Sequence, residues 1–469
     1  MTQAIQKKLN DSPVARWSVL AIVSITMMCG YFITDVMAPL QSMLETNFGW
    51  DGGQYGLFTS SYGWFNVTLF MLIIGGIILD KKGMRFTGTL ACGLMLIGCA
   101  VKYYAISPFF TMEGTLFGIN KQVLIASLGY ATFGVGVEIA GITVTKVIAR
   151  WFKGKEIALA MGLQVAMARI GTALALSMSV RVAKYFNEIS MPVLLGLILL
   201  CIGLIAYLVF CVMDRKLDAS IEETKTEEEK TEEKEDGFRL RDIGFIVKNK
   251  GFWLIAILCV LFYSAVFPFL KYATSLMINK YGVEEDLAGI IPSLLPFGTI
   301  LLTPIFGNIY DKIGKGATIM ILGSFLLILV HACFALPLLN VWWFATVMMI
   351  ILGIAFSLVP SAMWPSVPKI IPQKQLGTAY SMIFWVQNIG LSGVPLLIGI
   401  VLKEFCITGV RLNADGLEVT VYDYTLPMII FTCFGILAVF VAFMLKAEDK
   451  KKGYGLEQPN IKKEVAETA

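Results

Sequence analysis

About twelve apolar runs recur along the chain, and each is long enough to cross a lipid bilayer as a helix, which takes roughly 20 residues. Hydrophobic residues make up 57% of the sequence and charged residues only 15%, which is far from the composition of a soluble domain. The pattern therefore predicts an all-α membrane protein with twelve transmembrane helices. The runs cover residues 16–44, 54–79, 86–106, 121–150, 157–185, 190–213, 251–279, 287–309, 316–339, 341–369, 376–403 and 425–446.

The basic residues between these runs gather on one side of the predicted membrane. By the positive-inside rule this side is the cytoplasm, so both termini are expected there. The first run has no small-residue cleavage site, which predicts a retained helix, and the opposite loops lack an N-x-S/T sequon. We therefore expect a multi-pass protein of a bacterial inner membrane. The basic residues are Lys81, Lys82, Arg85, Arg150, Lys153, Lys155, Lys312, Lys315, Lys369 and Lys374.

The contents of the predicted spans disfavour several classes of function. The spans hold the one histidine of the chain, no clustered metal ligands, no H-E-x-x-H motif and no persuasive pair of nucleophile and base. We therefore expect no enzyme, no metal and no cofactor, no nucleic-acid partner, and a monomer in the lipid bilayer. A ligand-binding membrane sensor without turnover remains the alternative from another class.

The two halves of the chain repeat one another. "GIILDKKGMR" (76–85) and "GNIYDKIGKG" (307–316) share G-x-x-x-D-K-x-G, and residues 134–171 align with 353–390 in a second register. Such duplicated six-helix halves are common in transporters. A charged stretch without aromatic residues separates the halves. The predicted domains are an N-terminal bundle over 1–213, a cytoplasmic linker over 214–250, a C-terminal bundle over 251–447 and a cytoplasmic tail over 448–469.

These two loop motifs resemble the signature of the major facilitator superfamily, which lies between the second and third helices and is repeated weakly between the eighth and ninth. The resemblance implies two pseudo-symmetric six-helix bundles that alternate between inward-facing and outward-facing states. It also implies that the loops act in conformational gating, with Asp80 and Asp311 tying the cytoplasmic ends of the halves together in one state. The gating residues would be Asp80, Lys81, Gly83, Arg85, Asp311 and Lys312.

Two charges of opposite sign lie inside predicted spans at the same depth. Glu138 lies about 15 residues before the turn at 153–154 and Arg169 about 15 residues after it, which places both roughly 20 Å from the cytoplasmic end. A charge at this depth is costly and needs a partner, so we expect the two to pair, either as a structural staple or as the ends of a binding site. In the second half the residues that align with Glu138 and Arg169 are Ser357 and Asn388, which carry no charge, so the site is asymmetric.

Other polar groups in the spans are candidates for a substrate pathway. Asp35 lies in the outer part of the first span with Tyr31 one turn before it, and is a candidate for binding a substrate amine or a proton. Lys271 and His331 fall towards the outer ends of their spans, where snorkelling is the default. The C-terminal half adds aromatic and amide side chains, of which we select Tyr263, Trp364, Gln387 and Asn388.

A narrower resemblance comes from W-F-K-G-K-E (151–156), M-A-R-I-G (167–171), A-V-F-P-F (265–269), W-P (364–365) and Q-L-G-T-A-Y (375–380). These segments are similar to the branch of the superfamily that includes the lysosomal dipeptide transporter of animals. The resemblance implies dipeptide transport, with Glu138 engaging the amino end, Arg169 the carboxylate, and Asp35 and Tyr31 nearby. The competing interpretation is a proton-coupled carrier of a small organic or inorganic anion, in which Arg169 alone binds the substrate.

Overall fold

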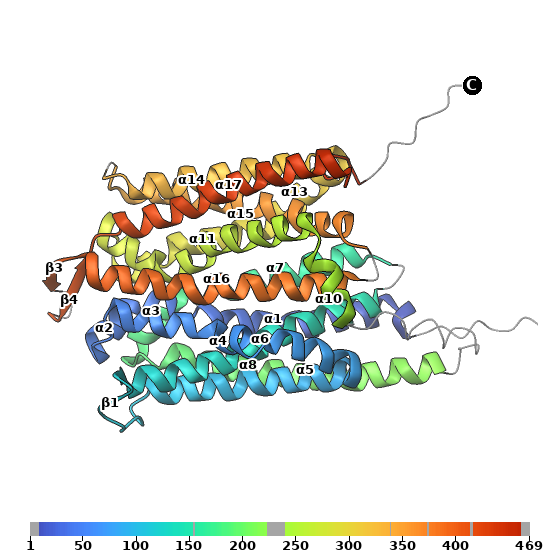
Figure 1. Cartoon of the computed structure of the whole chain (residues 1–469). Coiled ribbons are helices and arrows are strands. Elements are labelled where there is room, and N and C mark those ends of the chain that lie inside the picture. The colour runs from blue at the N-terminus through green and yellow to red at the C-terminus, as the bar shows by residue number, and fades with distance from the viewer. Residues whose placement is uncertain are drawn as a thin grey trace, which may run out of the picture.

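The computed structural model describes residues 9–152, 155–222, 240–337, 339–372, 375–412 and 416–460. Long helices run nearly parallel to one another, and two short β-hairpins lie at one end of them (Figure 1). The start of α1 and the end of α17 lie on the side opposite the hairpins. We call the two ends of the molecule the terminal side and the hairpin side.

The first half of the chain forms one bundle, most of it in the lower part of Figure 1. Within it α1 packs on α7 and α8, and α5 packs on α6 and α8. Its helices are η1 (Leu9–Asp11), α1 (Pro13–Asp35), η2 (Ala38–Leu40), α2 (Gln41–Phe48), α3 (Gly52–Ser60), η3 (Ser61–Gly63), α4 (Trp64–Thr68), α5 (Met71–Ile106), α6 (Lys121–Trp151), α7 (Ile157–Phe186) and α8 (Met191–Glu222). Its hairpin pairs β1 (Thr115–Leu116) with β2 (Ile119–Asn120).

The second half forms the other bundle. Here α11 packs on α16 and α17, while α14 packs on α15 and α17. Its helices are α10 (Leu240–Val247), α11 (Lys250–Tyr281), α12 (Glu285–Ala288), α13 (Ile290–Ile313), α14 (Gly316–Ala335), α15 (Trp342–Ile370), α16 (Leu376–Phe405) and α17 (Thr425–Lys452). Its hairpin pairs β3 (Ile407–Leu412) with β4 (Glu418–Tyr422). This arrangement confirms the predicted all-α fold class.

The described residues contain eleven helices long and apolar enough to cross a membrane, one fewer than the sequence predicts. The difference comes from the second and third spans. The second span is broken at η3 and again before α5, and α5 then continues into the third span through Gly83. Gly83 has φ 78° and ψ 173°, a left-handed turn that glycine adopts without steric cost. Residues on either side of Gly83 therefore belong to different spans, which gives twelve crossings.

The predicted linker is helical at both of its ends. Helix α8 continues to Glu222, and α10 forms over Leu240–Val247, while the middle of the predicted linker lies outside the described residues. The start of the predicted tail is also ordered. After α17 the chain turns back, and Leu456 is buried against the loop before α14, where the amides of Lys315 and Gly316 donate to Glu457 O (3.0 Å) and Leu456 O (2.9 Å).

The two halves meet most closely on the hairpin side. A Cβ atom added to Gly56 of α3 would lie 2.6 Å from the Cα of Gly399 in α16, so only glycine permits this approach. Ion pairs also cross between the halves here, including Lys403 with Asp51 at 3.2 Å. On the terminal side, ion pairs such as Lys146–Asp80 and Lys250–Glu448 join residues of a single half. The hairpin side is thus the sealed side of this conformation.

Candidate substrate-binding site

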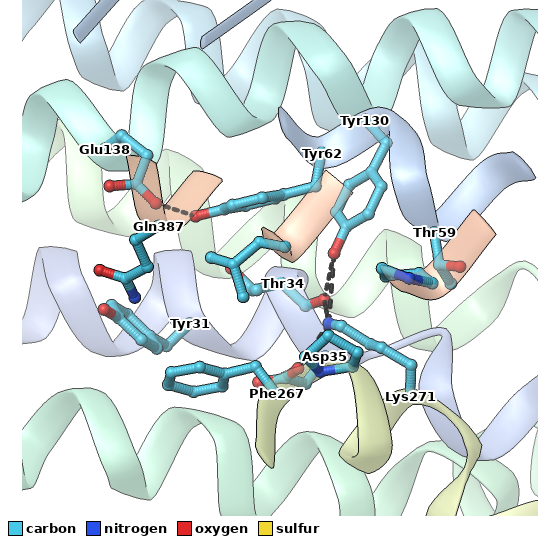
Figure 2. A pocket seen from close by; sticks show the side chains of 13 residues that line it. Tyr31, Thr34, Asp35, Thr59, Tyr62, Tyr130, Glu138, Phe267, Lys271 and Gln387 are labelled. Atoms are coloured by element: carbon cyan, nitrogen blue, oxygen red, sulfur yellow. Dashed lines mark hydrogen bonds and ion pairs between the residues drawn. The ribbon is translucent and has the colours of Figure 1, made fainter. Parts of the chain in front are cut away.

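A cavity lies between the two halves. Its empty space is about 550 Å³, a volume that includes open solvent at its mouth. Both halves contribute to its wall (Figure 2). The first half supplies Tyr31, Thr34, Asp35, Thr59, Tyr62, Tyr130 and Glu138, and the second half supplies Phe267, Pro268, Lys271, Gln387, Leu391 and Pro395.

Interrupted helices create the polar surface of this cavity. Helix α1 ends at Asp35, the second span breaks at η3, and Pro268 lies inside α11. Each break frees backbone carbonyls, which is tolerable inside a membrane only where a cavity or a side chain satisfies them. The Thr34 carbonyl shows this directly, because it accepts hydrogen bonds from Lys271 Nζ (2.6 Å) and from the Tyr130 hydroxyl (2.7 Å).

Glu138 presents a carboxylate to the cavity from α6. Its Oε1 accepts a hydrogen bond from the Tyr62 hydroxyl at 2.7 Å (Figure 2), and the Asn388 side chain also interacts with the carboxylate. Among the described residues, no lysine or arginine nitrogen lies within 4.0 Å of it. Glu138 therefore occupies the site as an acid without a counter-charge.

Arg169 of α7 lies against aromatic rings. Its guanidinium carbon is 5.0 Å from the ring centre of Phe356, 5.2 Å from that of Phe267 and 5.8 Å from that of Tyr31. Aromatic faces attract a cation but do not neutralise it. Within the described part of the chain, no carboxylate reaches Arg169 within 4.0 Å. The guanidinium is thus half-buried against three rings, and the described residues give its N–H groups no hydrogen bond.

The ion pair that we expected between Glu138 and Arg169 is not formed. Equal depth along two helices does not make two side chains face each other. Glu138 points towards Tyr62, whereas Arg169 points towards the aromatic residues of α11 and α15. Tyr31 is a shared neighbour, because its hydroxyl interacts electrostatically with both charges. The Glu138 carboxylate and the Arg169 guanidinium therefore lie apart from each other, and Tyr31 is a neighbour of both.

Asp35 has a partner that the sequence did not suggest. Lys271 Nζ lies 2.6 Å from Asp35 Oδ1, and Thr172 donates to Oδ2 at 2.7 Å. The expectation that Lys271 snorkels to the interface is therefore wrong, as it is for His331, which is buried with Nε2 2.9 Å from the Ala265 carbonyl. Both side chains find polar partners inside the protein, which costs less than stretching to the membrane surface.

The other candidates from the second half lie around Arg169 and Glu138. The Trp364 indole donates to the Tyr263 hydroxyl at 2.9 Å, and the Tyr263 ring packs edge-on against Phe356. These two residues therefore support the aromatic rings that hold Arg169. Gln387 lines the cavity directly, and Asn388 accepts a hydrogen bond from Asn66 of the first half at 3.4 Å.

The predicted gating residues form contacts within their own halves in this conformation. Asp80 pairs with Lys146 at 2.6 Å, and Arg85 pairs with Asp218 at 2.6 Å. The ties between the halves through Asp80 and Asp311 stay a prediction for another conformation. In the second motif copy, the tail residue Asn460 donates to Asp311 at 2.7 Å. Of the other three, Lys81 is exposed in α5, Lys312 is exposed in the last turn of α13, and Gly83 forms the turn within α5.

Sequence reasoning missed several polar residues around the site. Tyr62 and Tyr130 looked like ordinary membrane aromatics, and nothing in their spacing marks the hydrogen bonds that they make. Lys102 was detectable, since it is a lysine within the third apolar run, and it proves fully buried with Nζ 2.9 Å from the Ile33 carbonyl. In the described ranges, no group of three or more His, Cys, Asp or Glu residues is arranged to hold a metal ion.

Curated relatives share sequence with most of the chain. The lysosomal dipeptide transporter MFSD1 of Bos taurus is 28% identical over 397 residues, which cover 81% of this chain and 79% of that protein. The protein of the same name from Danio rerio is 29% identical over 385 residues, which cover 79% of this chain and 77% of the relative.

Solved structures share the fold at low identity. A point mutant of the nucleoside transporter NupG aligns with a TM-score of 0.66 at 16% identity, covering 91% of this chain and 99% of that chain. A bacterial homologue of the human lysosomal transporter Spinster, in an inward-facing and unoccupied conformation, aligns with a TM-score of 0.66 at 14% identity, covering 94% and 98%. The sequence model of the Major Facilitator Superfamily matches residues 20–395. This match spans most of the chain and agrees with the two-bundle fold, so the protein belongs to the Major Facilitator Superfamily.

Proposed function

We propose that this membrane transporter moves small peptides, with dipeptides as the main substrate class, by alternating access. The observation that carries the proposal is that Glu138 lines the cavity and Arg169 lies against the rings of Tyr31 and Phe267, which also line it, while neither charge has an ion-pair partner among the described residues. A dipeptide is a zwitterion whose ammonium and carboxylate groups supply both missing partners.

The physical argument rests on the cost of buried charges. A charged group removed from water regains stability only when it is paired and hydrogen-bonded. A lone anion would satisfy Arg169 and leave Glu138 unpaired, and a lone cation would do the reverse. A zwitterion satisfies both and loses its own water to two charge-assisted hydrogen-bonding partners. The two poles lie on different helices beside Tyr31, which suits a substrate with two distinct ends.

The names of the curated relatives support the same class of substrate. They are named as dipeptide transporters at 28–29% identity, whereas solved structures that share the fold include a nucleoside transporter at 16% identity and a D-xylose–proton symporter at 17% identity. Fold likeness alone does not select a substrate, because different functions are built on one fold. The chemistry of the site therefore remains the basis of the proposal, and the relatives add support to it.

Orientation and coupling belong to the same proposal. The basic loops lie on the terminal side, so we assign that side and both termini to the cytoplasm, in a bacterial inner membrane. Transport is uniport or proton-linked, with Asp35 as the candidate proton carrier. Uptake that is unaffected by a pH gradient would remove that role from Asp35.

The test is uptake of labelled dipeptides into proteoliposomes by the wild type, Glu138→Gln and Arg169→Ala. Each substitution should lower uptake efficiency at least about 30-fold, the loss for one partner of a buried charge pair. Arg181→Ala removes an exposed arginine from the same helix as Arg169 and should transport normally. An N-acetylated dipeptide, which lacks the ammonium group, should be a poor substrate of the wild type.

The runner-up, a proton-coupled anion carrier, predicts a different pattern. There Arg169 binds the anion while Glu138 titrates, so Glu138→Gln should keep anion uptake and change only its dependence on pH. Uptake of a small organic anion by the Glu138→Gln variant, with dipeptides inert in the wild type, would replace the dipeptide proposal. Ligand binding without any flux would instead indicate a sensor.

A further inference from the structure

The second span is interrupted where it passes the cavity. Helix α3 ends at Ser60, η3 forms a single 3-10 turn over Ser61–Gly63, and α4 resumes at Trp64. Tyr62 lies in the middle of this turn and lines the cavity, where its hydroxyl donates to Glu138 (Figure 2). The interruption therefore coincides with the residue that contacts the proposed acidic pole of the site.

The turn is held between the two halves of the protein. On one side, a Cβ atom added to Gly134 of α6 would lie 2.1 Å from the Tyr62 carbonyl oxygen. On the other side, a Cβ atom added to Gly63 would lie 2.8 Å from the Cβ of Ser392 in α16. Glycine at both positions lets the neighbouring segments approach, so the backbone of the turn is packed on both sides.

Side chains of α16 satisfy the carbonyls that the interruption frees. At the η3 turn Ser392 donates to the Ser60 carbonyl at 2.8 Å, and at the second break, before α5, the Trp385 indole donates to the Val67 carbonyl at 3.2 Å. An unsatisfied carbonyl in the membrane interior would cost several kcal/mol. The break is thus a supported feature of the fold, and its local result is to direct the Tyr62 hydroxyl at Glu138.

We propose that Tyr62 is a positioning residue for the Glu138 carboxylate and, through it, for the substrate ammonium group. This inference rests on the proposed function. A carboxylate has two oxygens and about four acceptor sites, so one hydrogen bond from Tyr62 fixes its orientation and leaves capacity for an ammonium group. A carboxylate that is already oriented loses less side-chain entropy when the substrate binds, which favours binding. Tyr62 contacts the carboxylate and contributes no charge of its own.

The test compares dipeptide uptake by the wild type, Tyr62→Phe, Glu138→Gln and the double variant. Tyr62→Phe should raise the KM for dipeptides about tenfold while Vmax is retained, as expected for the loss of one hydrogen bond to a charged group. The double variant should match Glu138→Gln, because without the carboxylate there is nothing to position. Tyr207→Phe is the matched control, since the Tyr207 hydroxyl is also buried and donates to Met84 O at 2.9 Å.

A second readout does not depend on the substrate. The infrared carboxylate band of Glu138, isolated as the difference between each protein and its Glu138→Gln counterpart, should shift in Tyr62→Phe and stay in place in Tyr207→Phe. An unshifted band, or a KM increase that persists in the Glu138→Gln background, would overturn the inference. A shifted band in a protein that moves no dipeptide would support the positioning of Glu138 and defeat the proposed function alone.

Discussion

Replacing Lys271 by methionine should open the hairpin side of the protein. Lys271 belongs to α11 in the second half and Asp35 to α1 in the first, and their charged atoms lie 2.6 Å apart. Their side chains are only 12% and 4% exposed, so solvent hardly screens the pair. The ion pair can form only while the two halves meet on this side, which makes it a stabilising contact of one conformation.

The magnitude follows from the burial of the pair. Removing one partner of a buried ion pair costs about 3–5 kcal/mol, because the other charge is left buried without compensation. In a conformation open on the hairpin side the pair is already separated, so the substitution raises the free energy of the sealed conformation alone. A cost of about 3 kcal/mol changes the ratio of the two conformations by about 100-fold.

Distances between spin labels would measure this change. Labels at Asn47 of α2 and Glu404 of α16 occupy exposed positions on different halves, and the exposed Cys201 and Cys433 would be replaced by serine beforehand. The wild type should give one short distance, and Lys271→Met should add a population at a longer distance.

Two comparisons make the result specific to the ion pair. Lys280→Met removes a lysine from the same helix whose Nζ bonds the Leu336 carbonyl of its own half at 2.6 Å, so it should leave the distances unchanged. Adding Asp35→Asn to Lys271→Met removes the stranded charge and should restore much of the short distance. A Lys271→Met protein with the wild-type distance distribution would refute the argument.

Three further substitutions test other parts of the structure. Gly56→Leu should lengthen the same label distance without changing any charge, because its Cβ would lie 2.6 Å from the Cα of Gly399; an unchanged distance would contradict the close packing. Asp214→Leu leaves the buried Trp151 indole N–H without its acceptor at 3.1 Å, while Arg85 and Arg150 keep Asp218; it should cost about 1–3 kcal/mol, seen as a lower midpoint of thermal unfolding, and an unchanged midpoint would contradict this role. Glu457→Ala loses the hydrogen bond from the Thr318 amide at 2.9 Å and should speed proteolysis after α17, whereas unaltered cleavage would show that other contacts hold the tail.

Much of the architecture could be read from the order of residues along the chain. The apolar runs predicted the spans because a helix in lipid must satisfy its backbone internally over a fixed length. The repeated G-x-x-x-D-K-x-G loops predicted two related halves. The depth of Glu138 and Arg169 also followed from counting residues, since a helix rises 1.5 Å per residue.

Partners across the bundle could not be read in this way. Asp35 and Lys271 are separated by 236 positions, and no local pattern brings them together. Glu138 and Arg169 share a depth yet turn towards different neighbours, because the direction of each side chain around its helix depends on the packing of other helices.

The sequence by itself therefore determined the class of protein, the number of crossings, and which charges had to be accommodated inside the membrane. Whether a segment can cross the bilayer depends on its own length and hydrophobicity, so each crossing can be predicted from its segment alone. Only the tertiary structure decided that Arg169 rests on aromatic rings, that Tyr62 meets Glu138 at a break in the second span, and that Lys271 joins the halves. These contacts join residues from different helices, and they exist only once the two bundles have packed against each other.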